Sequence, residues 1–159
     1  MASQDAELFS PDLVFFDIEA KDRHEFFQKL GEKLEEKGLI KSSWLGAIEE
    51  REANYATGLH FDSIEVAIPH VDPDNINKPY IAVVKPNTPI EFEHMAGAGP
   101  NVNAQVIMNL GVERDGGQVA VLQTFMNIFM NEDKSKEILA QDTPDGMVDV
   151  LTKFFEESE

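Results

Sequence analysis

The stretch TGLHFDSIEVAIPHVDPDNINKPYIAVV, residues 57–84, decides the fold class that the sequence predicts. It contains three short runs suited to strands, at 57–59, 64–68 and 80–84. Pro69 ends the second run, while Pro79 and Pro86 bound the third. Short runs rich in β-branched residues and bounded by prolines are typical of β-strands. The middle of the chain therefore predicts a sheet.

The chain before this stretch predicts a short strand and two helices. Residues 13–16 form an apolar run that suits a strand. Asp22 is expected to cap a helix with a continuous apolar stripe, and Gly38 is expected to end that helix in a left-handed conformation. Ser42 or Ser43 is expected to cap a second helix that ends near residue 52.

The chain after this stretch predicts one more strand, at 104–110, and then only helices. An amphipathic pattern predicts a helix over 118–130, and shorter helices are expected at 134–139 and 145–155. Helices, then consecutive strands, then helices predict an α/β fold with three layers, a mixed β-sheet flanked by helices on both faces. The strands do not alternate strictly with helices, which argues against a Rossmann fold.

Length and composition are those of one soluble domain. The 159 residues, 42% of them apolar, can bury a core, and we expect a single domain over 1–159 with residues 1–10 as a loose N-terminal arm. A net charge of −17 argues against nucleic acid as a partner, because such binding rests on Lys and Arg meeting phosphates. No apolar run approaches the roughly 20 residues of a membrane span, and no signal peptide begins the chain. We therefore expect a cytoplasmic protein without membrane insertion.

The four histidines are the main candidates for chemistry, because the chain has no Cys. No spacing of His and carboxylates matches a known metal motif, and no glycine pattern matches a phosphate-binding loop, so neither a metal nor a cofactor is expected. His24 and His94 are expected on the surface. His70 follows a buried-looking strand and Pro69, where strand pairing should stop, and a polar loop follows it. Side chains presented in this way are often functional, although a loop-exposed histidine without a role would show the same pattern.

These residues resemble a known family. Arg51-Glu52, then Thr57-Gly58, then Val66-Ala67-Ile68-Pro69-His70 resemble the mannitol/fructose-type enzyme IIA domains of the bacterial phosphoenolpyruvate-dependent sugar phosphotransferase system. The order of the later strands and helices is also similar, and the preceding Arg-Glu-Ala makes the galactitol-specific subgroup the closest in pattern. The chain departs from the family where Val71 replaces a small residue after the histidine. It departs again where Gln118 replaces the second histidine of mannitol-type members.

The resemblance implies a phosphotransferase that carries a phosphoryl group on His70. Imidazole suits this role because its pKa of about 6.5 leaves a neutral nitrogen at pH 7. Arg51 would bind the phosphoryl oxygens with its planar guanidinium, and Thr57 and Gln118 would donate hydrogen bonds to the group or the ring. The donor would be the phosphohistidine carrier protein, and the acceptor an enzyme IIB component. Leu59, Phe61, Ile64 and Val71 are candidates for an apolar rim that both partners contact.

Two alternatives remain open from the sequence. One is a regulatory, nitrogen-related enzyme IIA-like protein whose phosphorylation state controls protein partners. The other is a non-catalytic small-molecule or metal-binding domain in which His60 and His70 are ligands. Neither the transported sugar nor the oligomeric state follows from these residues.

Overall fold

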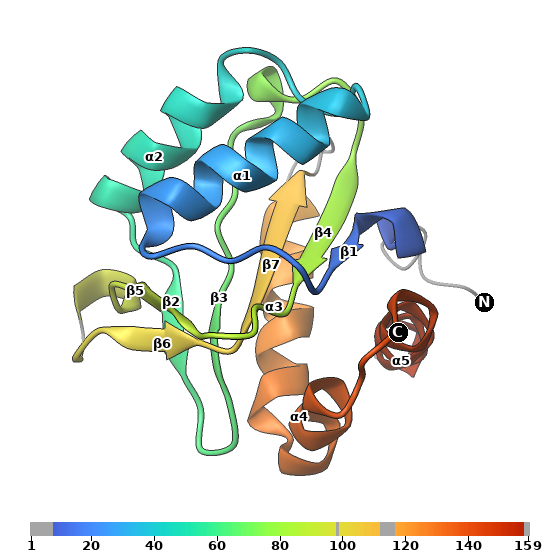
Figure 1. Cartoon of the computed structure of the whole chain (residues 1–159). Coiled ribbons are helices and arrows are strands. Elements are labelled where there is room, and N and C mark those ends of the chain that lie inside the picture. The colour runs from blue at the N-terminus through green and yellow to red at the C-terminus, as the bar shows by residue number, and fades with distance from the viewer. Residues whose placement is uncertain (1–7, 98, 112–116, 158–159) are drawn as a thin grey trace.

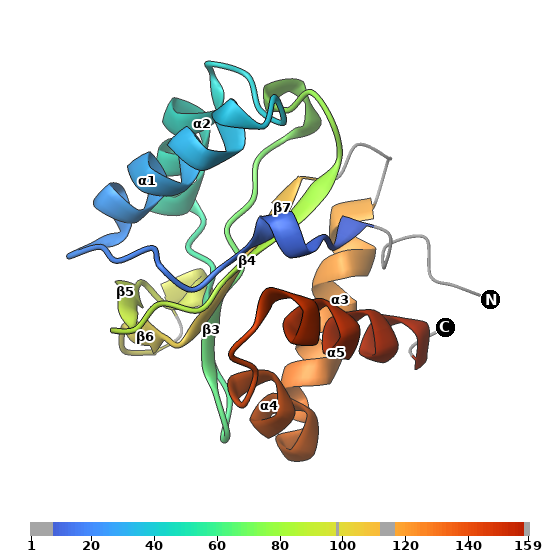
Figure 2. The same cartoon turned by 45° about the vertical axis from the view of Figure 1, so that its right-hand side comes forward.

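A five-stranded mixed sheet lies between two groups of helices (Figures 1 and 2) in the computed structural model, which describes residues 8–97, 99–111 and 117–157. The strand order is β1-β4-β7-β3-β2. The pairs β1–β4 and β3–β7 are parallel, and β4–β7 and β2–β3 are antiparallel. The strands are β1 (Val14–Phe15), β2 (Gly58–His60), β3 (Glu65–Ala67), β4 (Tyr80–Val84) and β7 (Val106–Gly111). The predicted three-layer α/β fold with a mixed sheet is confirmed.

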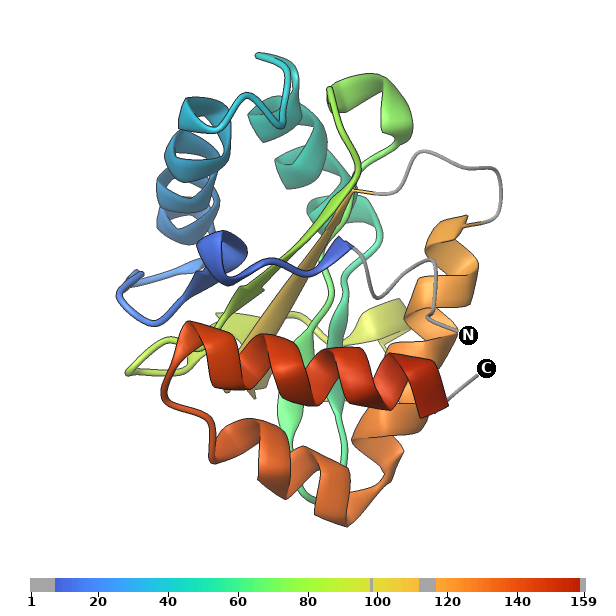
Figure 3. The same cartoon turned by 90° about the vertical axis from the view of Figure 1, so that its right-hand side faces the viewer.

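Each face of the sheet has its own apolar core. Helices α1 (Arg23–Glu36) and α2 (Trp44–Asn54) cover one face, and α3 (Gly117–Met130), α4 (Glu132–Leu139) and α5 (Pro144–Glu157) lie on the other (Figure 3). Side chains alternate along a strand, so Ile81 and Val83 of β4 join the core under α3–α5 while Tyr80 and its alternate neighbours join the core under α1 and α2. Burial on both faces explains why β4 is apolar along its whole length.

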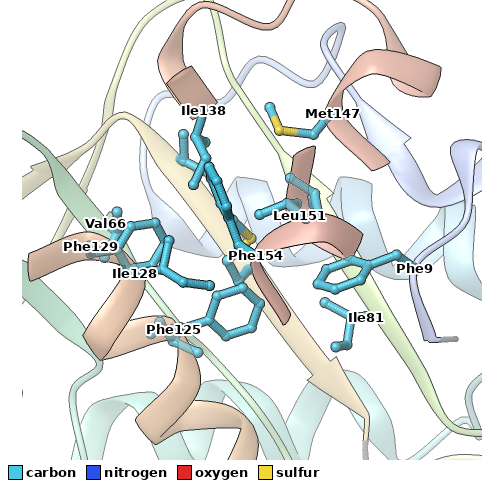
Figure 4. Packing of buried hydrophobic residues seen from close by; sticks show 14 of the residues in the cluster. Phe9, Val66, Ile81, Phe125, Ile128, Phe129, Ile138, Met147, Leu151 and Phe154 are labelled. Atoms are coloured by element: carbon cyan, nitrogen blue, oxygen red, sulfur yellow. The ribbon is translucent and has the colours of Figure 1, made fainter. Parts of the chain in front are cut away.

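The core under α3–α5 is rich in phenylalanine (Figure 4). Phe9 lies in this core, with its ring centroid 6.2 Å from that of Phe125 and 5.0 Å from that of Phe155. Within the expected arm of residues 1–10, Phe9 is therefore packed against the core. Residues 1–7 of that arm lie outside the described part of the chain.

The expected boundaries of the first helix are confirmed. The Asp22 carboxylate accepts a hydrogen bond from the Glu25 backbone N–H at 2.9 Å, and Gly38 has a φ of 73°. Ser43, one of the two expected caps of the second helix, is its N-cap residue. Ser43 has a helical backbone and makes no capping bond, because its hydroxyl donates to Asn75 Oδ1 at 2.8 Å instead.

The strand predicted over 104–110 is divided between two sheets. Residues Val102–Ala104 form β6, which pairs with β5 (Ile90–Phe92) in a separate two-stranded sheet, and β7 begins at Val106. Gln105 stands at the change of sheet: its backbone N–H donates to Glu65 O at 2.8 Å, and its side-chain oxygen accepts from Glu65 N at 3.0 Å. Periodicity could not show this division, because both halves of the run are apolar. No described helix is long and apolar enough to cross a membrane.

Candidate functional site: a buried histidine beside an arginine

His70 follows the end of β3 but remains attached to the sheet. Strand β3 ends at Ala67, as expected ahead of Pro69, yet Leu110 N donates to the Pro69 carbonyl at 3.1 Å and His70 forms a β-bridge with Leu110. Only 7% of His70 is exposed. The expectation that strand pairing stops at Pro69 was wrong, because a proline lacks the N–H donor but keeps its carbonyl acceptor.

The hydrogen bond of the His70 ring defines its reactive nitrogen. Nδ1 lies 2.9 Å from the carbonyl oxygen of Ile68. A carbonyl only accepts, so Nδ1 carries the hydrogen, and Nε2 of the neutral ring holds a free lone pair. Burial lowers the pKa of His70 below 6.5, and the Arg51 cation also lowers it, against the opposing effects of the Ile68 carbonyl and Asp72. The ring is therefore neutral and nucleophilic at pH 7.

His70 lines an open pocket of about 640 Å³. The pocket also contains Arg51 and Thr57, two of the other predicted site residues. Thr57 comes from just before β2 and His70 from the segment after β3, and the rest of the lining comes from the end of α2 and the loop after β5. The pocket therefore gives the buried imidazole an opening to the surface.

Arg51 lies near the end of α2 and has spare hydrogen-bonding capacity. Its Nη1 is 3.3 Å from Asp72 Oδ1, and its guanidinium carbon is 5.9 Å from the ring centroid of Tyr55. Arg51 Nε is buried and has no hydrogen-bond partner among the described residues. The ion pair is weak because the Asp72 side chain is 69% exposed. An incoming anion could therefore draw the guanidinium away from Asp72 at a small cost in free energy. Asp72 was not predicted from the sequence as a partner of Arg51, because the residues after His70 indicate only a polar loop.

Thr57 is held by a neighbouring carboxyl group. Its backbone N–H donates to Glu52 Oε1 at 2.9 Å, and its hydroxyl lies 3.0 and 2.9 Å from the two Glu52 oxygens. The Thr57 hydroxyl therefore contacts Glu52, whereas the sequence predicted a hydrogen bond to the phosphoryl group or the His70 ring. Gln118 lies in the first turn of α3, and its side chain is outside the described part of the chain.

A buried polar chain, which sequence reasoning missed, holds the backbone beside His70. Trp44 Nε1 donates to Tyr80 Oη at 3.1 Å, Tyr80 Oη donates to Asn109 Oδ1 at 2.6 Å, and Asn109 Nδ2 donates to the Pro69 carbonyl at 3.1 Å. Burial raises the pKa of Tyr80, which keeps the phenol protonated as a donor. The one signal in the sequence was Asn109, a polar residue inside an apolar strand. Its fully buried amide needs hydrogen-bond partners.

Residues 7–154 match the model of one protein family, described as phosphoenolpyruvate-dependent sugar phosphotransferase system, EIIA 2. The chain belongs to this family. Enzyme IIA components are phosphotransferases of that system, so the family resemblance and the class of activity predicted from the sequence are confirmed.

Individual relatives agree with this assignment. The galactitol-specific EIIA component of Escherichia coli is 26% identical over 102 residues, which cover 64% of this enzyme IIA chain and 67% of that protein. The nitrogen regulatory protein IIA-Ntr from Neisseria meningitidis has a TM-score of 0.76 at 19% identity, covering 92% of this chain and 97% of that one. Enzyme IIA in the Escherichia coli complex of mannitol enzyme IIA with phosphorylated enzyme IIB has a TM-score of 0.71 at 17% identity, covering 91% and 97%. The two structural likenesses show the shared fold.

The other histidines of this enzyme IIA chain are placed differently from His70. His94 was expected on the surface, but it is half-buried and lines the His70 pocket, with Nδ1 2.9 Å from the Met95 carbonyl. His60 pairs with Glu65 across the β2–β3 hairpin and does not line that pocket. The described residues contain no group of three or more His or carboxylates that could hold a metal ion. The alternative in which His60 and His70 are joint ligands therefore has no geometric support.

We expect His70 to titrate below the ordinary histidine value of 6.5, because burial and Arg51 disfavour the imidazolium. The neutral nucleophile should then persist as the pH falls to 6.5, and phosphorylation should slow only at lower pH. Ring NMR shifts of His70 followed against pH test this directly. A titration midpoint at or above 6.5 would contradict the electrostatic description of the pocket.

Proposed function

We propose that this protein accepts a phosphoryl group on Nε2 of His70 from the phosphohistidine carrier protein and passes it to an enzyme IIB component for sugar uptake and phosphorylation. The observation that supports this most strongly is the His70 ring itself. Its Nδ1 hydrogen is bonded to a backbone carbonyl, which leaves Nε2 as the nucleophile in an open pocket that also contains Arg51.

The chemistry needs no group beyond the side chains of the pocket. Nε2 attacks phosphorus as the P–N bond of the donor breaks, and Nδ1 keeps its hydrogen against the Ile68 carbonyl. The transferred group passes through a loose transition state with charge on its equatorial oxygens, so positioning and electrostatics dominate catalysis. The P–N bond formed at His70 then breaks in the same way when the acceptor attacks.

Arg51 is the proposed stabiliser of the phosphoryl oxygens. Its Nε has no partner among the described residues, and its link to Asp72 is an exposed and weak ion pair. A planar guanidinium can bind two phosphate oxygens at once. We assign supporting hydrogen bonds to the Thr57 hydroxyl and to Gln118, whose place at the start of α3 puts backbone N–H donors near it.

The partner surface differs from the rim expected from the sequence. Leu59, Ile64 and Val71 are buried, and Phe61 packs against the core under α3–α5, so these residues do not form an exposed rim. Tyr55 is 70% exposed and lines the pocket beside Arg51. Exposed tyrosines are common anchors at protein interfaces. Tyr55 is therefore the proposed contact for the donor and the acceptor, which would bind the same surface one after the other.

The sequence relatives favour transport over regulation. The galactitol-specific EIIA component supports a polyol or related sugar as the transported substrate, whereas the likeness to the nitrogen regulatory protein reflects fold alone. A place in the cytoplasm would follow from this role, since carrier and acceptor meet there. Transfer of the label to a cognate enzyme IIB separates the two functions, because a regulator lacks a productive acceptor.

The deciding experiment is to label the protein with phosphoenolpyruvate in the presence of the two general phosphotransfer proteins and to map the label by mass spectrometry. We expect one phosphoryl group per chain, on His70. The label should disappear when enzyme IIB and sugar are added. A label on another residue would remove the central assignment.

A further inference from the structure

Glu52 is the most buried acidic side chain in the described part of the chain, with 3% of it exposed. It follows Arg51 directly, and its carboxyl group accepts from the Thr57 N–H and lies within hydrogen-bond distance of the Thr57 hydroxyl. Burial raises the pKa of Glu52 to about 7, with a small further rise from Glu93 and opposing effects from Thr57 and Arg23. A carboxyl group that is partly protonated at neutral pH beside a phosphoryl site has no role in the mechanism above.

A short chain of hydrogen bonds joins Glu52 to the His70 ring. Thr57 N–H donates to Glu52, and the Thr57 carbonyl accepts from Ile68 N–H at 3.3 Å. The Ile68 carbonyl in turn accepts from His70 Nδ1. Thr57 also lines the His70 pocket, so the residue that contacts the Glu52 carboxyl is part of the same pocket as the histidine.

We propose that Glu52 is a proton-accepting positioning residue: it takes up a proton when His70 is phosphorylated, and the Thr57 hydroxyl then turns to donate to a phosphoryl oxygen. The inference rests on the proposed function of His70. It adds to that function, because it names the group whose protonation changes between the unphosphorylated and the phosphorylated state of His70.

The argument follows from the hydroxyl having only one hydrogen. When Glu52 is ionised, a carboxylate can only accept, so the Thr57 hydrogen points to Glu52. When Glu52 is protonated, its own O–H can donate to Thr57 Oγ1, and the Thr57 hydrogen is released toward the pocket. Distances of 3.0 and 2.9 Å suit both arrangements, so the exchange needs no backbone movement.

The charge balance favours the second arrangement after phosphoryl transfer. The P–N bond forms at His70 Nε2, the donor's P–N bond breaks, and Nδ1 keeps its hydrogen, so the pocket gains one net negative charge. Like charges disfavour ionisation, and Glu52 then takes a proton from solvent. The charged groups that face Glu52 are Arg23, at the start of α1, and Glu93, after β5, and these two pair with each other at 3.6 Å. Glu52 is left as the group free to respond.

The test is the equilibrium constant for phosphoryl transfer from the carrier protein, measured from pH 6 to 9 in wild type and Glu52→Gln. Glutamine keeps the shape and an acceptor for Thr57 N–H but cannot titrate. Contributions of the donor and of His70 cancel in the ratio of the two constants. We expect the ratio of wild type to variant to fall with rising pH, by about tenfold for each unit by which phosphorylation raises the Glu52 pKa. A ratio independent of pH overturns the proposal.

Two further measurements keep the result clear. Glu36→Gln removes an exposed carboxylate at the end of α1, outside the pocket, and its ratio to wild type should not vary with pH. Carboxyl carbon NMR of Glu52 in wild type, before and after phosphorylation, should show a higher midpoint in the phosphorylated protein, and an unchanged midpoint overturns the proposal even if Glu52→Gln does not fold. Labelling of His70 persists in either case, which separates failure of this inference from failure of the proposed function.

Discussion

His70→Ala is expected to abolish phosphoryl labelling by phosphoenolpyruvate and the general phosphotransfer proteins. The substitution removes the imidazole that lines the pocket and whose Nε2 holds the free lone pair. Among the residues around that pocket, His94 is the one other imidazole that the structure describes, and its backbone belongs to the loop after β5. The measurement is the stoichiometry of the label at saturating donor, and a label retained near one group per chain would overturn the assignment.

His60→Ala is the matched control. It removes an exposed imidazole whose described contact is the pair with Glu65, and it leaves the His70 pocket intact. Labelling of this variant should equal that of wild type. Because His70 is buried, circular dichroism and a thermal melt of His70→Ala should accompany the assay, so that loss of label is not read from an unfolded protein.

Arg51→Ala is expected to slow phosphoryl transfer by roughly 100- to 1,000-fold, the usual cost of removing one preorganised charge-stabilising group from a transition state. The fold should survive, because the ion pair with the exposed Asp72 is worth about 1 kcal/mol or less. Single-turnover rates of transfer from the carrier protein measure the effect. An unchanged rate would make Arg51 a structural cation at the end of α2.

Asp72→Asn separates the two roles of Arg51. It removes the ion pair but leaves the guanidinium in place, so transfer should proceed at or above the wild-type rate if Arg51 serves the phosphoryl group. A loss as large as that of Arg51→Ala would instead show that the ion pair itself is what matters. Arg51→Lys adds a second comparison, since lysine keeps the charge but lacks the planar fork that binds two oxygens.

Local chemistry explains why much of the fold could be predicted. The helix that Asp22 caps and Gly38 ends, and the strand of five apolar residues from Tyr80, depend on hydrogen bonds and periodicity within a few neighbouring residues. Predictions failed where a distant residue decided the outcome. The Ser43 hydroxyl donates to Asn75 and so makes no capping bond at its N-cap position, and Gln105 binds Glu65 where the chain leaves one sheet for another.

The candidate site divides in the same way. The sequence named His70 and Arg51 through a short pattern, and the structure brings both to one pocket. It could not show that Asn109, 40 residues from Pro69, holds the backbone beside the histidine, nor that His94 enters the same pocket. Nothing in the order of residues reports such contacts, because they depend on which strands become neighbours.

The amino-acid order alone was enough for the layered architecture and the family, and it predicts His70 as the reactive histidine, because these depend on periodicity and on a short local pattern. Three-dimensional packing was needed for the tautomer of His70, its burial and the raised pKa of Glu52. Each of these depends on how much water is excluded and on which carbonyl, carboxyl or guanidinium comes near through strand pairing. Water is excluded from a side chain only when several segments, distant in the sequence, pack around it, so no single segment determines its burial.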